Sequence, residues 1–125
     1  MRADTAEDES ILGKPGNEAR CIEQLRSCSG RAVSFLTAVA VLRHTDGVAQ
    51  EFVDTTQVMF RTLEDAAIVR YVALEAPFDC AGGFKSEGLG IALCDSIDSM
   101  DPSALIGLPL IRLSAVLRSV GFELP

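Results

Sequence analysis

The residues best suited to chemistry lie in a glycine-rich turn, "GGFKSEG" at 82–88, directly before an apolar run. Gly82 and Gly83 let a backbone approach a ligand closely, with N–H groups that can face it. Glu87 stands at the mouth of an expected buried strand, where a carboxylate is costly unless it meets hydrogen-bond donors. Guanine supplies two such donors, and a guanine alkylated at N7 adds positive charge. The turn therefore predicts a guanine-type base site, and a solvated β-turn with a routine Lys/Glu pair is the alternative.

Two lysines could complete a site for a nucleotide. Lys85 and Glu87 flank Ser86, and we expect the two charged side chains to face opposite sides, one toward the base and one toward solvent or phosphate. Lys14, in "GKPG", has its stem held between a glycine and a proline while its ammonium stays available, which suits a phosphate. The alternative for Lys14 is a plain surface lysine before a helix.

Other polar and sulfur-containing groups are interpreted structurally. Three aspartates could suggest a hard cation, but they lack the glycine and glutamate of an EF-hand loop, so we interpret them as solvated loop charge: Asp95, Asp98 and Asp101. The four cysteines contain no C-x-x-C pair, and Cys21 and Cys28 are expected to be core thiols on one helical face. His44, the only histidine, lies beside a turn and is expected at the surface.

Composition limits the classes of function. The 125 residues fit one domain, and 48% of them are hydrophobic, enough for a core. A net charge of −7 argues against a general nucleic-acid-binding protein, although a local basic pocket could still hold a small anion. No apolar run reaches the length of a membrane span, and the acidic start "MRADTAEDES" lacks a signal-peptide core. We therefore expect a soluble, cytoplasmic protein.

The elements that must position the site follow an α-β-β-α-β-α order. Residues 1–10 are expected to form a flexible acidic start, and residues 11–125 one domain. Apolar periodicity and caps predict helices over 17–29, from Thr62 to Pro77, and from Pro109 to Gly121. Apolar and β-branched runs predict strands over 32–42, 48–60 and 89–94, with a hairpin turn at 45–47 and a short helical turn at 101–107.

Two of these elements carry predictions about burial. The second half of 32–42 is apolar at every position, so we expect burial on both faces and a central place in the sheet. The last helix is expected to bury one apolar face, made of Leu110, Leu113, Val116, Leu117 and Val120.

Four blocks of the chain, read in order, resemble one known family. They are "GKPGNEARCIEQLRSCSGRAVSFLTAVAVL", "VMFRTLEDAAIVRYV", "DCAGGFKSEGLGIAL" and "LIGLPLIRLSAVLRSVGF". From Ile11 almost to its end the chain is similar to the Maf-like nucleotide pyrophosphatases. Its "FKSEGLGI" resembles the subfamily that hydrolyses 7-methyl-GTP. The resemblance implies an α/β fold of the Maf/ITPase-like type, with a mixed sheet flanked by helices.

The resemblance also implies a reaction and its participants. Such enzymes cleave a nucleoside triphosphate between the α and β phosphates, releasing a monophosphate and pyrophosphate, with magnesium or manganese as cofactor. Lys14 would neutralise phosphate charge as pyrophosphate leaves. Glu87 would select the base, with Lys85, Ser86 and Gly83 as further substrate-binding residues. The family is often dimeric, so a homodimer is expected.

Two family motifs have no counterpart here. The family opens with an S-x-S-x-x-R-R phosphate loop and places a general-base aspartate in an S-D-Q triplet, whose position falls near Arg2. Asp4 and Asp8 are nearby, but no general base or metal ligand is assigned. We therefore expect the chain to correspond to the C-terminal portion of the domain, slow or inactive by itself. The alternative function is a non-catalytic nucleotide-binding or dimerising remnant.

Overall fold

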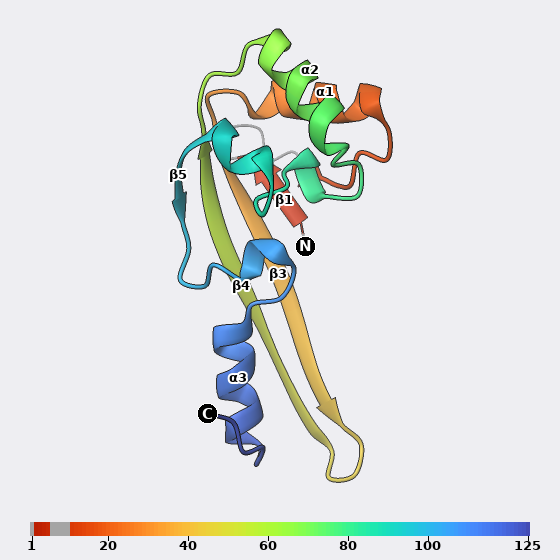
Figure 1. Ribbon diagram of the computed structural model, residues 1–125. Helices are drawn as coiled ribbons and strands as arrows, with labels where there is room; N and C mark the ends of the chain where they lie inside the picture. The colour runs from red at the N-terminus through yellow and green to blue at the C-terminus, as the bar shows by residue number, and fades with distance from the viewer. Residues whose placement is uncertain (1, 6–10) are drawn as a thin grey trace.

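The computed structural model describes residues 2–5 and 11–125 (Figure 1). Within them one sheet has the strand order β2-β1-β3-β4-β5. Its strands are β1 (Arg2–Thr5), β2 (Ile11–Leu12), β3 (Ala32–Arg43), β4 (Val48–Phe60) and β5 (Cys94–Asp98). The helices are α1 (Glu18–Cys28), α2 (Asp65–Glu75) and α3 (Leu110–Ser119), with short 3-10 helices η1 (Ala81–Gly83), η2 (Leu89–Leu93) and η3 (Ala104–Ile106).

The predicted α/β class is confirmed, with two corrections to the sheet. All pairings between the described strands are antiparallel, whereas a mixed sheet was expected. Residues 2–5 of the expected flexible start form β1, which pairs with β3 at Val33–Leu36. The expected flexible start also included residues 1 and 6–10, which lie outside the described residues.

The longest feature is the hairpin of β3 and β4, which extends well past the end of the molecule that carries α1 and α2 (Figure 1). The predicted turn at 45–47 is confirmed, with Gly47 at a φ of 70°. Burial of the second half of β3 on both faces was wrong: Val33 is fully buried, but Leu42 is 64% exposed. The reason is that β1 flanks only the first part of β3, so the remainder continues as an arm. We call residues 38–53 the arm.

The core lies where α1 and α2 pack against the end of the β3–β4 hairpin that is farthest from the turn at 45–47. Phe84 bridges β3 and β4, with ring centroids 5.5 Å from Phe35 and 5.3 Å from Phe60. Cys21 and Cys28 are buried as predicted, and burial raises the pKa of the Cys21 thiol to about 11. Cys21 is therefore an unreactive core thiol at neutral pH. His44 is exposed, as expected.

Helix α2 starts later than the sequence suggested. Its N-cap is Glu64, not Thr62, and Thr62 is exposed. The amide of Leu63, just after Thr62, donates instead to the Ser29 hydroxyl across 2.7 Å. Asp65 then opens the helix and pairs with Arg26 of α1 at 2.9 Å. No side chain caps the start of the helix, and tertiary contacts on either side of Glu64 fix where it begins.

The predicted strand 89–94 is also wrong, because residues 89–93 form η2 and the strand β5 begins only at Cys94. The Gly90 amide donates to the Lys85 carbonyl oxygen across 3.0 Å. A Cβ at Gly90 would lie 2.3 Å from that oxygen. The turn is therefore too tightly wound for an extended chain to begin there.

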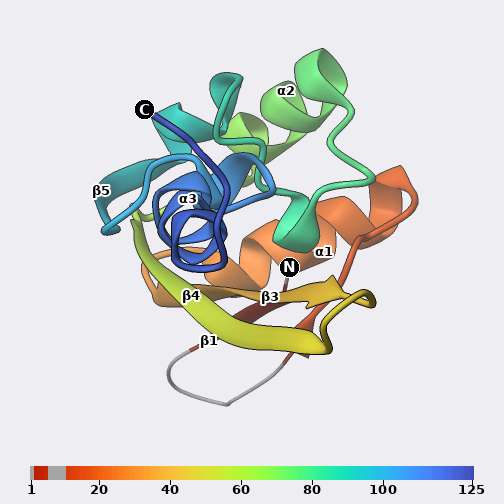
Figure 2. The ribbon, with the colours of Figure 1, turned by 90° about the horizontal axis from the view of Figure 1, so that it is seen from below.

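Helix α3 lies along the arm (Figures 1 and 2). Arg112 donates to the Val53 carbonyl across 2.9 Å, and its guanidinium lies 4.6 Å from the centre of the Phe52 ring. Arg43 donates to the Val120 carbonyl across 2.8 Å. The predicted apolar face is only partly buried: Leu113, Val116, Leu117 and Val120 are half-buried, Leu110 is exposed, and no residue of α3 is fully buried. Gly121, with a φ of 106°, follows the helix as expected.

Asp101 is another correction, since it is 2% exposed rather than solvated. Its carboxylate accepts the amides of Ser103 at 2.9 Å and Ile111 at 2.8 Å, which ties the start of α3 to the preceding loop. Asp95 and Asp98 lie in β5 rather than in a loop.

Candidate functional site

Lys14 and Glu87 line one pocket of about 250 Å³, although they are far apart in the sequence. Its other lining residues are Asp79, Cys80, Ala81, Phe84, Leu105, Ile106 and Gly107. The structure thus brings together the two residues that the sequence singled out for phosphate and for base.

Two backbone hydrogen bonds hold Lys14 at this pocket. The Gly16 amide donates to the Phe78 carbonyl across 2.9 Å, and the Gly82 amide donates to the Gly13 carbonyl across 3.1 Å. Between them Pro15 is fully buried, whereas Lys14 is exposed. The segment is anchored on both sides of the lysine, and the ammonium is left toward solvent.

A second pocket, of about 350 Å³, adjoins the first and shares Glu87, Leu105 and Ile106 with it. Its remaining lining residues are Ser86, Ile91, Ile97, Ser99 and Pro102. The Ser86 hydroxyl lies 3.5 Å from the Glu87 carboxylate. Glu87 therefore stands between a polar pocket that holds Lys14 and a pocket walled mainly by aliphatic side chains.

Lys85 and Gly83 are placed away from both pockets. The Lys85 ammonium lies 3.4 Å from the Glu75 carboxylate of α2, so Lys85 and Glu87 do face different partners. Gly83 is buried against α1, where a Cβ would lie 2.8 Å from the Cys21 sulfur. The amides of Gly82 and Gly83 are bonded to carbonyls within the protein. The substrate-binding roles of these residues stay predictions.

Sequence reasoning assigned no role to Asp79 and Cys80, which lie beside Lys14. Burial raises the pKa of Cys80, and the carboxylates of Asp79 and Glu87 raise it further while Lys85 opposes them. Cys80 is therefore a neutral thiol rather than a nucleophile at neutral pH. The "FDC" that precedes the glycines was the only local signal for these two residues.

The aliphatic wall from η3 was also missed. Leu105 and Ile106 follow the turn by some distance along the chain, and nothing in their local sequence connects them to Glu87. Their place depends on the buried Asp101, which fixes the loop that carries η3.

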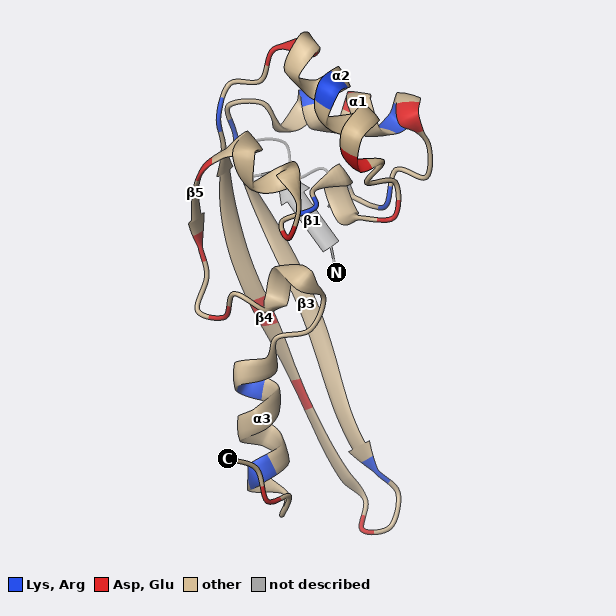
Figure 3. Ribbon diagram, in the orientation of Figure 1, with Lys and Arg blue, Asp and Glu red and all other residues tan. Residues whose placement is uncertain are grey.

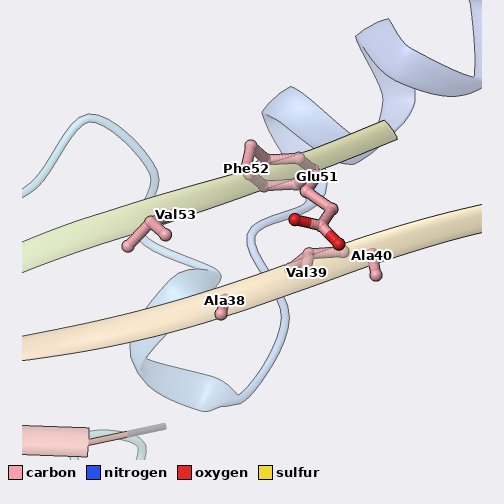
Figure 4. Close-up of a pocket in the computed structure, with 6 residues that line it drawn as sticks. All are labelled: Ala38, Val39, Ala40, Glu51, Phe52 and Val53. Atoms are coloured by element: carbon pink, nitrogen blue, oxygen red, sulfur yellow. The ribbon is translucent and has the colours of Figure 1, made fainter. Parts of the chain in front are cut away.

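A larger pocket, of about 470 Å³, lies on the arm and is lined by Ala38, Val39, Ala40, Glu51, Phe52 and Val53 (Figure 4). Its one charged lining residue is Glu51. Charged side chains are sparse along both strands of the arm (Figure 3). With a carboxylate and no cation in its lining, it does not suit a phosphate.

The described ranges, 2–5 and 11–125, contain no group of three or more His, Cys, Asp or Glu side chains arranged to hold a metal ion. No helix among them is long and apolar enough to cross a membrane.

Comparison with known proteins identifies the family of the chain. The profile of the Maf-like protein family matches residues 1–120, which extends the resemblance back over the acidic start. A protein named 7-methyl-GTP pyrophosphatase from Alkalilimnicola ehrlichii is 54% identical over 116 residues, covering 93% of this chain and 58% of that protein. A protein of the same name from Albidiferax ferrireducens is 51% identical over 116 residues, with the same coverage. The chain thus spans little more than half the length of these relatives, and it belongs to the Maf-like protein family.

Proposed function

We propose that this chain carries the base-reading and phosphate-binding side of a nucleotide pyrophosphatase whose substrate is 7-methyl-GTP. The observation that carries the proposal is the pocket that Lys14 and Glu87 share. It offers a cation for a phosphate chain and a carboxylate for a base within one cavity. The names of the relatives support the same substrate.

Base recognition would fall to Glu87 and the aliphatic pocket beside it. The carboxylate would accept hydrogen bonds from N1–H and the exocyclic amine of guanine. A methyl group at N7 makes the ring cationic, and a carboxylate attracts that charge. The side chains of Ile91, Ile97 and Leu105 would pack against the methylated base without competing for its polar groups.

Phosphate chemistry would fall to Lys14. Hydrolysis adds water across the bond between the α and β phosphates and releases pyrophosphate with additional negative charge. An ammonium already placed at the leaving group stabilises that charge more in the transition state than in the bound substrate. Lys14 is suited to this because its backbone is anchored on both sides.

The family resemblance further suggests magnesium or manganese as cofactor. The described residues do not by themselves form a site for either ion, since the pocket contains only the carboxylates of Asp79 and Glu87. Magnesium is commonly held by one or two carboxylates together with substrate phosphates. We assign no step to the metal.

We also propose a homodimer and a cytoplasmic location. Exposed apolar side chains on the arm, on α3 and just after α3 support self-association, among them Leu42, Ile111 and Phe122. Light scattering coupled to size-exclusion chromatography tests the dimer, and a strictly monomeric chain over a wide concentration range would contradict it.

The function is tested by pyrophosphate release from 7-methyl-GTP, GTP, dTTP and UTP with magnesium. We expect turnover of 7-methyl-GTP above that of GTP, and loss of this preference in Glu87→Ala. Glu64→Gln, at the start of α2 and outside both pockets, is the matched control. Equal turnover of all four nucleotides would contradict the substrate assignment. Selective binding without turnover would instead favour a nucleotide-binding remnant.

A further inference from the structure

We propose that Tyr71 and Glu75 are positioning residues that clamp the two ends of the turn 83–89 and thereby fix Glu87. They lie four residues apart on α2, which places both side chains on one helical face. The inference rests on the proposed function, because it concerns how the base-reading carboxylate is held.

Tyr71 holds the first end of the turn. Its side chain is buried, and its hydroxyl donates to the Gly83 carbonyl across 2.6 Å while accepting the Lys85 amide at 2.9 Å. Burial raises the pKa of Tyr71, so the hydroxyl keeps its proton across the physiological range. One hydroxyl therefore satisfies two backbone groups on either side of Phe84, a core residue.

Glu75 holds the second end. One carboxylate oxygen accepts the Leu89 amide at 2.8 Å, and the other lies 3.4 Å from the Lys85 ammonium. The backbone passes so close that a Cβ at Gly88 would lie 2.6 Å from the carboxylate. The glycine after Glu87 is thus required by the clamp and not only by the freedom of the turn.

Glu87 itself has little to hold it. Its side chain is exposed, and its carboxylate accepts a long hydrogen bond from the Ser86 hydroxyl at 3.5 Å. Its position over the pocket therefore depends on the backbone between the two clamped ends. A loosened turn would still present a carboxylate, but not at a fixed distance from the base.

The test uses five variants, one of which is Lys85→Ala, and three measurements. Tyr71→Phe removes both hydrogen bonds of the hydroxyl, Glu75→Ala removes both contacts of the carboxylate, and Glu75→Gln keeps an acceptor for Leu89 while losing the charge. Glu64→Gln is the control. Amide exchange by NMR reports on the turn, and titration with 7-methyl-GTP and GTP reports on selectivity. The melting temperature of each variant is also measured, so that a local effect on the turn can be separated from a loss of global stability.

We expect amide exchange to accelerate about tenfold at Lys85 in Tyr71→Phe and at Leu89 in Glu75→Ala, as for loss of one hydrogen bond. The preference for 7-methyl-GTP over GTP should fall by a similar factor. Glu75→Gln should restore the slow exchange of Leu89. The control should change neither measurement. Should Tyr71→Phe not fold, the two Glu75 variants decide alone.

Three results would overturn the clamp. Unchanged exchange at both amides would show that the two side chains do not hold the turn. Equal weakening of both nucleotides, in step with a lowered melting temperature, would indicate a merely structural role. Weakened binding in Lys85→Ala but not in Glu75→Ala would place Lys85 on the substrate rather than in the clamp. A wild type without nucleotide preference contradicts the proposed function instead, and the exchange data still decide on the clamp.

Discussion

At the scale of the residue, the site depends on two charged groups with different supports. Lys14 is carried by a short segment that two backbone hydrogen bonds fasten to residues 78–82. Glu87 is carried by a turn that side chains of α2 fasten at both ends. The lysine would meet phosphate, whose charge acts over a distance, while the carboxylate would meet a base, where direction matters. The more elaborate support belongs to the group that needs the finer placement.

Replacing Lys14 separates the phosphate role from the base role. In Lys14→Gln we expect the affinity for 7-methyl-GTP to fall about tenfold or more, since a charge-assisted hydrogen bond contributes about 1.5–3 kcal/mol. Affinity for the nucleoside 7-methylguanosine should not change. Calorimetric titration of both ligands measures this. Arg70→Gln, an exposed charge on α2, is the control. An equal loss for nucleoside and nucleotide would show that Lys14 does not act on phosphate.

At the scale of the element, the winding of 82–93 explains the largest error of the sequence analysis. "LGIALC" has the composition of a strand, yet Leu89 and Ile91 are about half exposed and the segment is a 3-10 helix. The determining contact is between Gly90 and the Lys85 carbonyl. No periodicity encodes a contact of this kind, because it depends on how the preceding turn is held.

Substitution of that glycine tests the explanation. Gly90→Ala should destabilise the protein by about 1–3 kcal/mol, since the added methyl group meets backbone rather than a flexible side chain. Gly13→Ala, where a Cβ would meet nothing within 4 Å, should stay within about 0.5 kcal/mol. Urea denaturation of the two variants provides the comparison. Equal stabilities would mean that the turn relaxes easily.

The junction between β4 and α3 places two aspartates in opposite situations. Asp54 has one buried carboxylate oxygen without a hydrogen-bond partner, and burial raises the pKa of Asp54, with Asp101 adding to the shift and Arg112 opposing it. Burial would also raise the pKa of Asp101, but hydrogen bonds from Ser103 and Ile111 outweigh it and lower that pKa. The two carboxylates therefore affect stability with opposite dependence on pH.

Substituting each aspartate by asparagine should reveal the opposite pH dependence of their contributions to stability. Asp101 has a folded pKa below its unfolded value, so its contribution is present at neutral pH and is lost as pH falls through the folded pKa. Asp101→Asn should therefore cost about 1–3 kcal/mol at neutral pH and less in acid. Asp54 has a raised folded pKa, so Asp54→Asn should stabilise at neutral pH, with the gain vanishing in acid. Denaturation at several pH values measures both, and parallel pH profiles would contradict the assignment.

At the scale of the whole molecule, the chain divides into a packed end and an extended arm. Local signals were enough for α1, the hairpin at 45–47 and Gly121, because caps and turn residues act over a few positions. Lys14 and Glu87 stood out for the same reason. The exposure of Leu42, the burial of Asp101 and the contribution of Leu105 to the pocket were not predictable, since each depends on what lies beside it in space.

The arm should be the least protected part of the sheet. Amides of residues 48–52 should exchange faster than those of 56–60 on the same strand, because few buried apolar contacts support the arm. Hydrogen-exchange mass spectrometry resolves the two segments. Equal protection at low protein concentration would contradict this expectation. Protection of the arm that grows with concentration would indicate that a second copy covers it.

The hydrogen bonds that join residues 13–16 to 78–82 also bear on the order of folding. The two walls of the pocket belong to segments that are separated in the chain by α1, the hairpin and α2. Because contacts between residues far apart in sequence require closure of a long loop, we expect these hydrogen bonds to form late in folding. A ligand that bridges Lys14 and Glu87 would therefore bind only chains that have completed this closure. Nucleotide binding would therefore stabilise the fully folded state, and the melting temperature would rise with increasing ligand concentration.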